Sequence, residues 1–348
     1  QLEYDDEVAF HARQALHNYA REDREQPFCL TVSFTHPHDP FVARQQFWDH
    51  YPEETLPSPA TSAIAYEDHD PHTKRLFDMS NWREFEVTDQ DVINSRRAYF
   101  ANISYIDSLM AGILETLDAC DFVEETIILF VSDHGEMLGE KGLWFKMSFL
   151  EGSARVPLMI HAPRRFDPTN VIAPASTLDV FPTLLDLAGL PVPDNLDGES
   201  LLPALIGRTY ERSVISEYAA EGSIAPMVMV RDATHKLIVC PADPDLLFDL
   251  EADPQENSSL TSMIDHGAKH AELRAAIDDA YDFEAFNAAV LTSQTQRLLI
   301  YDALRNGQYF PWDYQPLQLA SERYMRNHKD LNVLEGNARY PRFKPNQT

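Results

Sequence analysis

The pattern of apolar and polar residues predicts a chain in which helices alternate with strands. Apolar positions at helical spacing predict a helix over residues 5–21, and an apolar run predicts a buried strand over residues 28–34. The sequence Thr-Asp-Gln-Asp at residues 88–91 is a capping box that predicts the start of a long helix. A second apolar run, residues 126–131, predicts another buried strand. A strand, a helix and a strand in this order predict a parallel sheet covered by helices, which is the α/β class.

The second half of the chain carries shorter patterns. Apolar runs at residues 213–216, 226–230 and 236–239 predict a small antiparallel sheet, and residues 268–306 are strongly helical. The residues of this helical stretch that are expected to face a core are Leu273, Ile277, Ala280, Phe283, Leu298, Leu299, Tyr301 and Leu304.

The length of 348 residues is enough for one large core and a smaller subdomain. We expect an α/β domain over residues 1–205, an α+β subdomain with a small sheet and a long helix over residues 206–307, and a tail over residues 308–348. The aromatic residues of the tail predict that it docks on a neighbouring subunit.

The composition is that of a globular protein with a strong negative charge. Hydrophobic residues make up 44% of the chain, and no run approaches the ~18 apolar residues of a membrane span. The formal net charge of −28 argues against binding to nucleic acid or anionic membranes and permits a cationic substrate. Three widely spaced cysteines give no reason to expect an oxidising compartment, so we expect a cytoplasmic location.

Candidate chemistry follows both predicted strands. Asp133 and His134 come directly after residues 126–131, where an adjacent carboxylate and imidazole could share a divalent metal. In the other interpretation, Asp133 merely caps its own backbone in a turn. His36 and His38 follow residues 28–34 and are held by prolines, which suits binding of an oxyanion or protonation of a leaving group. If the two strands are parallel, these groups lie at one edge of the sheet.

Two further histidines lie in an acidic stretch. His69 and His72 occur in the sequence YEDHDPHTK within residues 42–87, a region rich in Pro, Asp, Glu and His. We interpret them as part of a solvated loop rather than as a metal site.

A longer sequence match extends the first of these candidate sites. The stretch SDHGEMLGEKGLWFKMSFLEGSARVPL, residues 132–158, resembles the second signature of the sulfatases of the alkaline-phosphatase-like superfamily, and among them the choline sulfatases. The resemblance implies a mostly parallel sheet flanked by helices. It also implies that Asp133 and His134 bind the metal, that Lys146 binds a sulfate oxygen, and that His38, in a Pro-His-x-Pro loop, contacts the sulfate.

The resemblance also implies a substrate, choline-O-sulfate, which water would cleave to choline and sulfate. A quaternary ammonium cannot donate a hydrogen bond and is best met by aromatic faces and carboxylates. Glu217, Glu221, Asp313 and Asp330 are candidate carboxylates, and the resemblance favours Glu221 and Asp330. The tail resembles the C-terminal extension of choline sulfatases, which implies a homo-oligomer, a dimer or a tetramer.

One part of the family pattern does not occur in this sequence. Sulfatases generate a formylglycine nucleophile from Cys or Ser in C/S-x-P-x-R, and none of Cys29, Cys120 and Cys240 lies in such a motif. The paired N-terminal aspartates of the metal site are also missing. We therefore expect the chain to be the C-terminal two-thirds of such an enzyme, with little or no turnover alone. The expected metal is Ca²⁺, and Mn²⁺ or Mg²⁺ would also suit a site rich in oxygen ligands.

Two alternative functions stay open. His134 stands where many sulfatases carry Asn, and His is shared by choline sulfatases and phosphonate monoester hydrolases. The first alternative is therefore a phosphonate or phosphate monoester hydrolase, or an arylsulfatase, of the same superfamily. The second is a non-catalytic chain that binds a cationic osmolyte or serves as a scaffold. A requirement for the quaternary ammonium in turnover would exclude the first alternative, whereas the second predicts affinity for choline without sulfate release.

Overall fold

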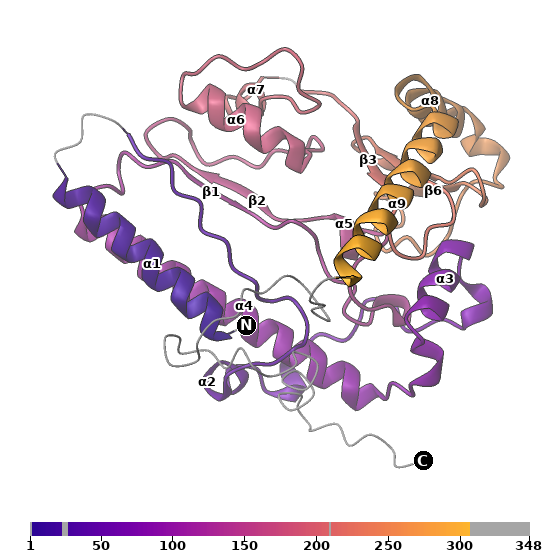
Figure 1. Ribbon diagram of the computed structural model, residues 1–348, viewed down its shortest axis with the longest axis horizontal. Coiled ribbons are helices and arrows are strands. Elements are labelled where there is room, and N and C mark those ends of the chain that lie inside the picture. Colours follow the sequence, from indigo (N-terminus) through magenta and orange to yellow (C-terminus); the bar gives the residue numbers. More distant parts are fainter. Residues whose placement is uncertain (1, 23–26, 209, 307–348) are drawn as a thin grey trace. The chain divides into compact units, whose positions relative to one another are not determined.

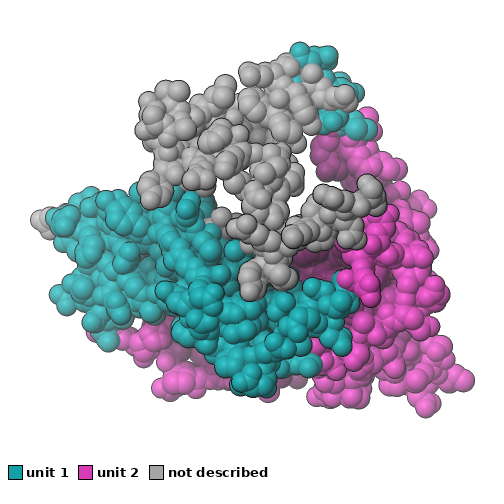
Figure 2. All heavy atoms as spheres, turned by 90° about the horizontal axis from the view of Figure 1, so that it is seen from below, with its two compact units in different colours: residues 1–58, 87–125, 298–348 teal, residues 59–86, 126–297 magenta. Residues whose placement is uncertain are grey.

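The computed structural model describes residues 2–22, 27–208 and 210–306. These residues form two compact units (Figure 2). The first comprises the described residues of Gln1–Ser58, Val87–Glu125 and Leu298–Thr348, and the second comprises Pro59–Glu86 and Thr126–Arg297.

The first unit is built on two long helices. Helix α1, Leu2–Arg21, packs along α4, Asp89–Ala119, and the short helices α2, Gln45–Trp48, and η1, Glu53–Thr55, complete it (Figure 1). The predicted capping box is confirmed, because the Thr88 side chain accepts from the Asp91 amide and the Asp91 carboxylate accepts from the Thr88 amide. The hydrophobic core of this unit is lined by Phe47, Ala101, Tyr105 and Ile106.

Residues 28–34 do not form the predicted buried strand. They are extended, and exposed residues alternate with half-buried ones along them. A strand requires a neighbour that pairs with its backbone groups, and in the described part of the chain no other strand pairs with this segment. The apolar pattern therefore identified an extended segment with one covered side, but the prediction of a strand was wrong.

The second unit contains two antiparallel sheets. Strand β1, Ile128–Val131, pairs with β2, Leu158–His161. The second sheet has the order β3-β4-β5-β6, with β3 at Val214–Tyr218, β4 at Met227–Arg231, β5 at His235–Val239 and β6 at Leu246–Asp249. This sheet confirms the small antiparallel sheet predicted from the apolar runs. The strands that the structure describes pair only antiparallel, so they do not form the parallel sheet that the element order predicted.

The four-stranded sheet is buried on both faces. Val228, Val230 and Leu237 point to one face, where Leu273 and Ile277 of the helix α8, Gly267–Ala280, cover them. The alternate residues of β4 and β5 point to the opposite face. There Met227, Met229 and Ile238 pack with Phe248 of β6 and with Phe149. Burial on both sides explains why β4 and β5 read as continuous apolar runs.

The remaining helices are short except the last. They are α3 at Pro71–Met79, α5 at Glu151–Ala154, α6 at Val180–Leu187, α7 at Leu202–Leu205 and α9 at Phe283–Arg305, with 3₁₀ turns at Tyr66–Asp68, Trp82–Glu84, Glu140–Gly142, Thr177–Asp179 and Ile264–His266. Leu273 and Ile277 are buried as predicted. Leu298, Leu299, Tyr301 and Leu304 are 62%, 72%, 48% and 66% exposed, so the prediction that they face a core was wrong.

Candidate active site

Asp133 and His134 lie in a loop that leaves the end of β1 and passes close to α5. The amide of Gly135 donates to the carbonyl oxygen of Ser153 at 2.7 Å. A Cβ at Gly135 would lie 2.2 Å from the carbonyl oxygen of Gly152, so only glycine allows this approach. The glycine thus fixes where the preceding Asp-His pair lies.

The geometry of the Asp-His pair fits part of a metal site. Oδ2 of Asp133 lies 3.8 Å from Nε2 of His134, and the Asp133 side chain is 87% exposed. Nδ1 of His134 lies 2.8 Å from the carbonyl oxygen of Gly135 and must carry the proton, because a carbonyl only accepts. In the neutral imidazole the lone pair is then on Nε2, toward the carboxylate, as in histidines that bind metals. Within the described residues no group of three or more His, Cys, Asp and Glu could hold an ion, so a metal site at this pair stays a prediction.

Lys146 lies in a loop whose backbone is strained on both sides. Phe145 and Met147 have φ angles of 65° and 77°, in the left-handed region that side chains other than glycine rarely adopt. The amide of Phe145 donates to the Glu136 carboxylate at 2.5 Å, and the carbonyl oxygen of Phe145 accepts from the Met137 amide at 2.8 Å. These contacts hold the conformation of the loop and thereby the direction in which Lys146 leaves it.

A buried ion network follows this loop. Nζ of Lys236 donates to Oε1 of Glu151 at 2.6 Å, to Oε1 of Glu256 at 2.8 Å and to the Phe149 carbonyl oxygen at 2.7 Å. Lys141 adds a bond from its Nζ to the Glu256 carbonyl oxygen at 2.9 Å. Burial raises the pKa of Glu256 and lowers that of Lys141, although opposite charges oppose both shifts. The network ties the loop and α5 to β5 and to the turn after β6.

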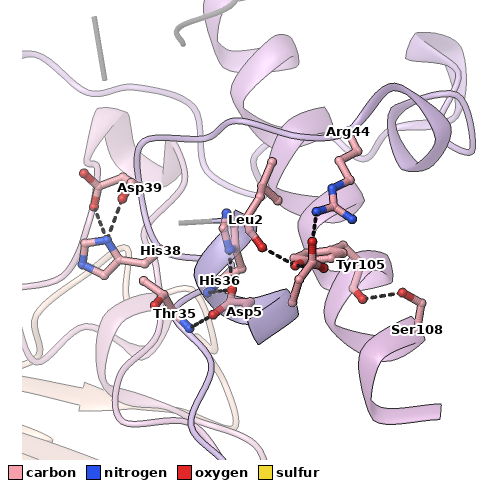
Figure 3. Close-up of polar contacts among 10 residues, drawn as sticks. Leu2, Asp5, Thr35, His36, His38, Asp39, Arg44, Tyr105 and Ser108 are labelled. Atoms are coloured by element: carbon pink, nitrogen blue, oxygen red, sulfur yellow. Dashed lines mark hydrogen bonds and ion pairs between the residues drawn. The ribbon is translucent and has the colours of Figure 1, made fainter. Parts of the chain in front are cut away.

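His36 and His38 lie in the first unit (Figure 3). The Asp5 carboxylate accepts from the amides of Thr35 and His36 at 2.8 and 3.1 Å and from Nδ1 of His36 at 2.5 Å. Burial alone would raise the pKa of Asp5, but these hydrogen bonds hold it below its ordinary value. His36 is therefore a buried support of the loop rather than an exposed imidazole.

His38 has the orientation expected of a group that acts through Nε2. Its Nδ1 lies 2.8 Å from the Asp39 carbonyl oxygen and 3.0 Å from Oδ1 of the same residue, and the side chain is 37% exposed. Nδ1 therefore carries a proton, because a carbonyl oxygen only accepts. His38 and His134 share this arrangement although they belong to different units. Whether His38 meets the Asp133 pair at one edge stays a prediction.

The predicted ammonium-binding carboxylates have different outcomes. Glu221 is exposed in the turn after β3, where the hydroxyl of Tyr218 lies 2.9 Å from its carbonyl oxygen and 3.3 Å from its Oε2. Burial, followed by the negative charge of Glu221, raises the pKa of Tyr218, so the phenol stays protonated. An aromatic ring and a carboxylate thus lie together, as a quaternary ammonium requires. Asp330 and Asp313 lie outside the described residues.

The interpretation of His69 and His72 as a solvated loop was wrong. Their exposed fractions are 6% and 5%, and Nε2 of His72 donates to the Met147 carbonyl oxygen at 2.7 Å. The signal that could have found them is the Asp70-Pro71 pair, which caps and begins α3. A helix starting at Pro71 places His72 on the same face as Leu76, which is also buried.

Comparison with known protein families identifies the family of this chain. Residues 2–190 match the family model described as Sulfatase, residues 139–282 match N-sulphoglucosamine sulphohydrolase, C-terminal, and residues 288–340 match choline sulfatase enzyme C terminal. The chain belongs to the sulfatase family. The predicted family is thereby confirmed, and its members are sulfuric ester hydrolases.

Related proteins match the chain over different fractions of its length. A choline-sulfatase of Rhizobium meliloti is 50% identical over 98% of the chain, which spans 68% of that protein. Arylsulfatase K of Gallus gallus is 37% identical over 49% of the chain, which spans 34% of that protein. An arylsulfatase of Clostridium perfringens is 32% identical over 69% of the chain and 50% of its own length.

Solved structures show the same fold. A phosphonate monoester hydrolase from Silicibacter pomeroyi superposes with a TM-score of 0.67 at 25% identity, over 77% of this chain and 58% of that one. A putative sulfatase from Bacteroides thetaiotaomicron gives a TM-score of 0.65 at 22% identity, over 78% of this chain and 62% of that one. These similarities confirm the predicted α/β class. None of the helices in the described ranges is long and apolar enough to cross a membrane.

Proposed function

We propose that this chain carries substrate-binding and metal-binding residues of an enzyme that hydrolyses choline-O-sulfate to choline and sulfate. The observation that carries this proposal is the 50% identity to a choline-sulfatase over 98% of the chain. The match of residues 288–340 to the C-terminal model of choline sulfatases supports it further. The net charge of −28 suits a cationic substrate.

Each part of choline-O-sulfate has a group in this chain whose chemistry suits it. Lys146 offers a compact ammonium that binds a sulfate oxygen and stabilises the negative charge of the transition state. His38, in its doubly protonated form, delivers the proton of Nε2 to the leaving oxygen of choline. Glu221 offers its carboxylate, and Tyr218 its ring, to the quaternary ammonium. We propose Asp330 as a second carboxylate for this cation.

We further propose that Asp133 and His134 bind one divalent cation, with Ca²⁺ as the first choice and Mg²⁺ or Mn²⁺ as alternatives. The carboxylate and the Nε2 tautomer of the imidazole support this assignment. When bound, the cation would offset the charge of the sulfate oxygens. The family's nucleophile is a formylglycine, and the 348 residues contain no C/S-x-P-x-R motif. The contributions assigned to this chain are therefore binding, orientation and proton delivery.

The other assignments are also proposals. We place the sulfatase α/β domain at residues 1–205, the smaller subdomain at residues 206–307 and a tail for contacts between identical subunits at residues 308–348. We expect a cytoplasmic homo-oligomer that acts on a small molecule and has no nucleic-acid or membrane partner.

One observation favours a second candidate. The phosphonate monoester hydrolase of Silicibacter pomeroyi has the same fold, and His134 fits such an enzyme as well as a choline sulfatase. A hydrolase of that kind has no need for a cation on its substrate.

The test compares three esters with the natural polypeptide that contains this sequence. We would measure product release from choline-O-sulfate, from its uncharged isostere 3,3-dimethylbutyl sulfate, and from a phenyl phosphonate monoester. We expect kcat/KM to be about tenfold or more higher for the cationic sulfate, a difference of ~1.4 kcal/mol. Equal rates for the cationic and neutral sulfates, or a preference for the phosphonate, would refute the proposal. Choline binding without any turnover would favour the non-catalytic alternative.

A further inference from the structure

Helix α3 holds the backbone next to Lys146. Nε2 of the buried His72 donates to the carbonyl oxygen of Met147 at 2.7 Å. Met147 and Phe145 both have left-handed φ angles, which L residues keep only when their surroundings hold them. His72 is therefore a tertiary restraint on the strained backbone that flanks Lys146.

The same helix holds the backbone next to Glu221. Nε of Arg75 donates to the carbonyl oxygen of Gly222 at 2.8 Å, and its guanidinium also donates twice to Asp243, at 3.0 and 2.5 Å. The Asp243 side chain is 9% exposed, so Arg75 has little freedom to move. Gly222 has a φ of 74°, and a Cβ there would lie 2.6 Å from Cδ2 of Leu76. The turn that carries Glu221 is thus packed directly against α3.

A ring contact connects the two sides. The ring of His72 meets the ring of Tyr218 edge to face, with centroids 5.8 Å apart and an interplanar angle of 74°. The Tyr218 hydroxyl in turn contacts Glu221. From Met147 to Glu221 the contacts therefore run through His72 and Tyr218 without a break.

We propose that α3 is a positioning helix that sets the distance between the sulfate-binding Lys146 and the ammonium-binding Glu221. His72 acts on the first, and Arg75 with Leu76 acts on the second. Resting on the function proposed above, this assigns α3 a role in specificity: it selects esters whose cation lies two carbons from the ester oxygen. A fixed distance between two charged contacts penalises a substrate that is one methylene longer.

The experiment uses the natural polypeptide with three sulfate esters. They are choline-O-sulfate, its homologue with one more methylene, and the neutral 3,3-dimethylbutyl sulfate. For the wild type we expect kcat/KM to be about tenfold higher for choline-O-sulfate than for the longer homologue. For Arg75→Met and Gly222→Ala we expect this length preference to fall to within about twofold, because the Glu221 turn is no longer fixed.

His72 and a neighbouring lysine supply further variants. His72→Leu should lower kcat for all three esters by roughly tenfold or more, whereas His72→Gln, which keeps a donor near the Nε2 position, should recover most of the loss. Lys74→Met is the matched control. It removes a cation from the same helix, and the Nζ of Lys74 donates to the carbonyl oxygen of Glu67, which belongs to neither the Lys146 loop nor the Glu221 turn. It should keep the length preference of the wild type.

The outcomes separate this inference from the proposed function. If the wild type does not prefer choline-O-sulfate over its neutral isostere, the proposed function fails. If that preference holds but Arg75→Met and Gly222→Ala retain the full length preference at temperatures where both are folded, α3 does not set the distance and the inference is wrong. Failure of His72→Gln to exceed His72→Leu would likewise overturn the role of His72.

Discussion

Replacing Lys236 by methionine tests the buried ion network most directly. Nζ of Lys236 uses its three protons on the carboxylates of Glu151 and Glu256 and on the carbonyl oxygen of Phe149, and the side chain is 0% exposed. Methionine fills a similar volume but brings no charge and no donor. The Glu256 side chain, 3% exposed, would then lose the cation that offsets its burial.

The magnitude follows from this uncompensated charge. Removing one partner of a buried ion pair costs roughly 3–5 kcal/mol of unfolding free energy. Burial already raises the pKa of Glu256 above its ordinary value of 4.5 despite the ammonium, and without Lys236 it must rise further. A raised folded-state pKa stabilises the fold at low pH, and this stabilisation is lost as the pH rises through it. The cost of Lys236→Met should therefore be smaller at pH 5 than at pH 8.

The assay is urea unfolding followed by tryptophan fluorescence at both pH values. At pH 8 we expect a loss of roughly 3–5 kcal/mol for Lys236→Met. The double variant with Glu256→Gln should lose about 2 kcal/mol less than the two single losses added, because the amide removes the charge and keeps an acceptor for the Glu151 amide. Lys269→Met is the control: the Lys269 side chain is 29% exposed, so we expect a loss below about 1 kcal/mol.

Three results would refute this reasoning. A loss below about 1 kcal/mol for Lys236→Met at pH 8 would mean that the unpaired carboxylate costs little. A loss that is the same at pH 5 and pH 8 would mean that Glu256 does not take up a proton. Additive losses in the double variant would mean that Lys236 and Glu256 are not coupled.

Three further predictions concern other parts of the chain. Thr88→Ala should lower the unfolding free energy by about 1 kcal/mol through loss of the capping box, measured by urea unfolding, with no change in metal affinity. Asp133→Asn should weaken Ca²⁺ binding by about tenfold or more in a calorimetric titration of the natural polypeptide, and unchanged affinity would remove Asp133 from the metal site. Asp5 has a lowered pKa, so its stabilisation is present above its ordinary pKa of 3.8 and is lost as the pH falls through the folded-state value. Asp5→Asn should therefore destabilise the fold near pH 7 by roughly 1–3 kcal/mol, because the amide is uncharged and has one acceptor oxygen where the carboxylate has two. It should also flatten the pH dependence of urea unfolding below about pH 4, and an unchanged acid profile would contradict this.

Elements with a local signal could be predicted from the sequence. The capping box at residues 88–91 fixed the start of α4, and the apolar runs at residues 226–230 and 236–239 predicted the strands β4 and β5 of a small antiparallel sheet. The prediction of a strand at residues 28–34 was wrong, because an apolar run does not show whether a neighbouring strand offers backbone hydrogen bonds. The prediction that Leu298 and Leu299 face a core was wrong for a related reason. Helical spacing identifies an apolar face of a helix but does not show whether another element covers that face.

The candidate site divides in the same way. Asp133, His134 and Lys146 could be named as candidates because they lie within one short signature, and their roles stay predictions. His72 could not be assigned, because its role depends on a carbonyl 75 positions later in the chain. The ion pair between Lys236 and Glu256 could not be predicted either, because Glu256 lies in a turn whose conformation the sequence pattern does not specify.

These long-range contacts explain how the loop around Lys146 can be strained and still be ordered. Left-handed φ angles at Phe145 and Met147 are unfavourable, so the isolated segment would adopt other conformations. Glu136 and His72 hold the strained residues themselves, and Lys236 holds the segment where it enters α5. Weakening any of these contacts should release the loop before the whole unit unfolds. We therefore expect Lys236→Met to lower kcat of the natural enzyme at temperatures where its far-UV circular dichroism is still that of the folded protein.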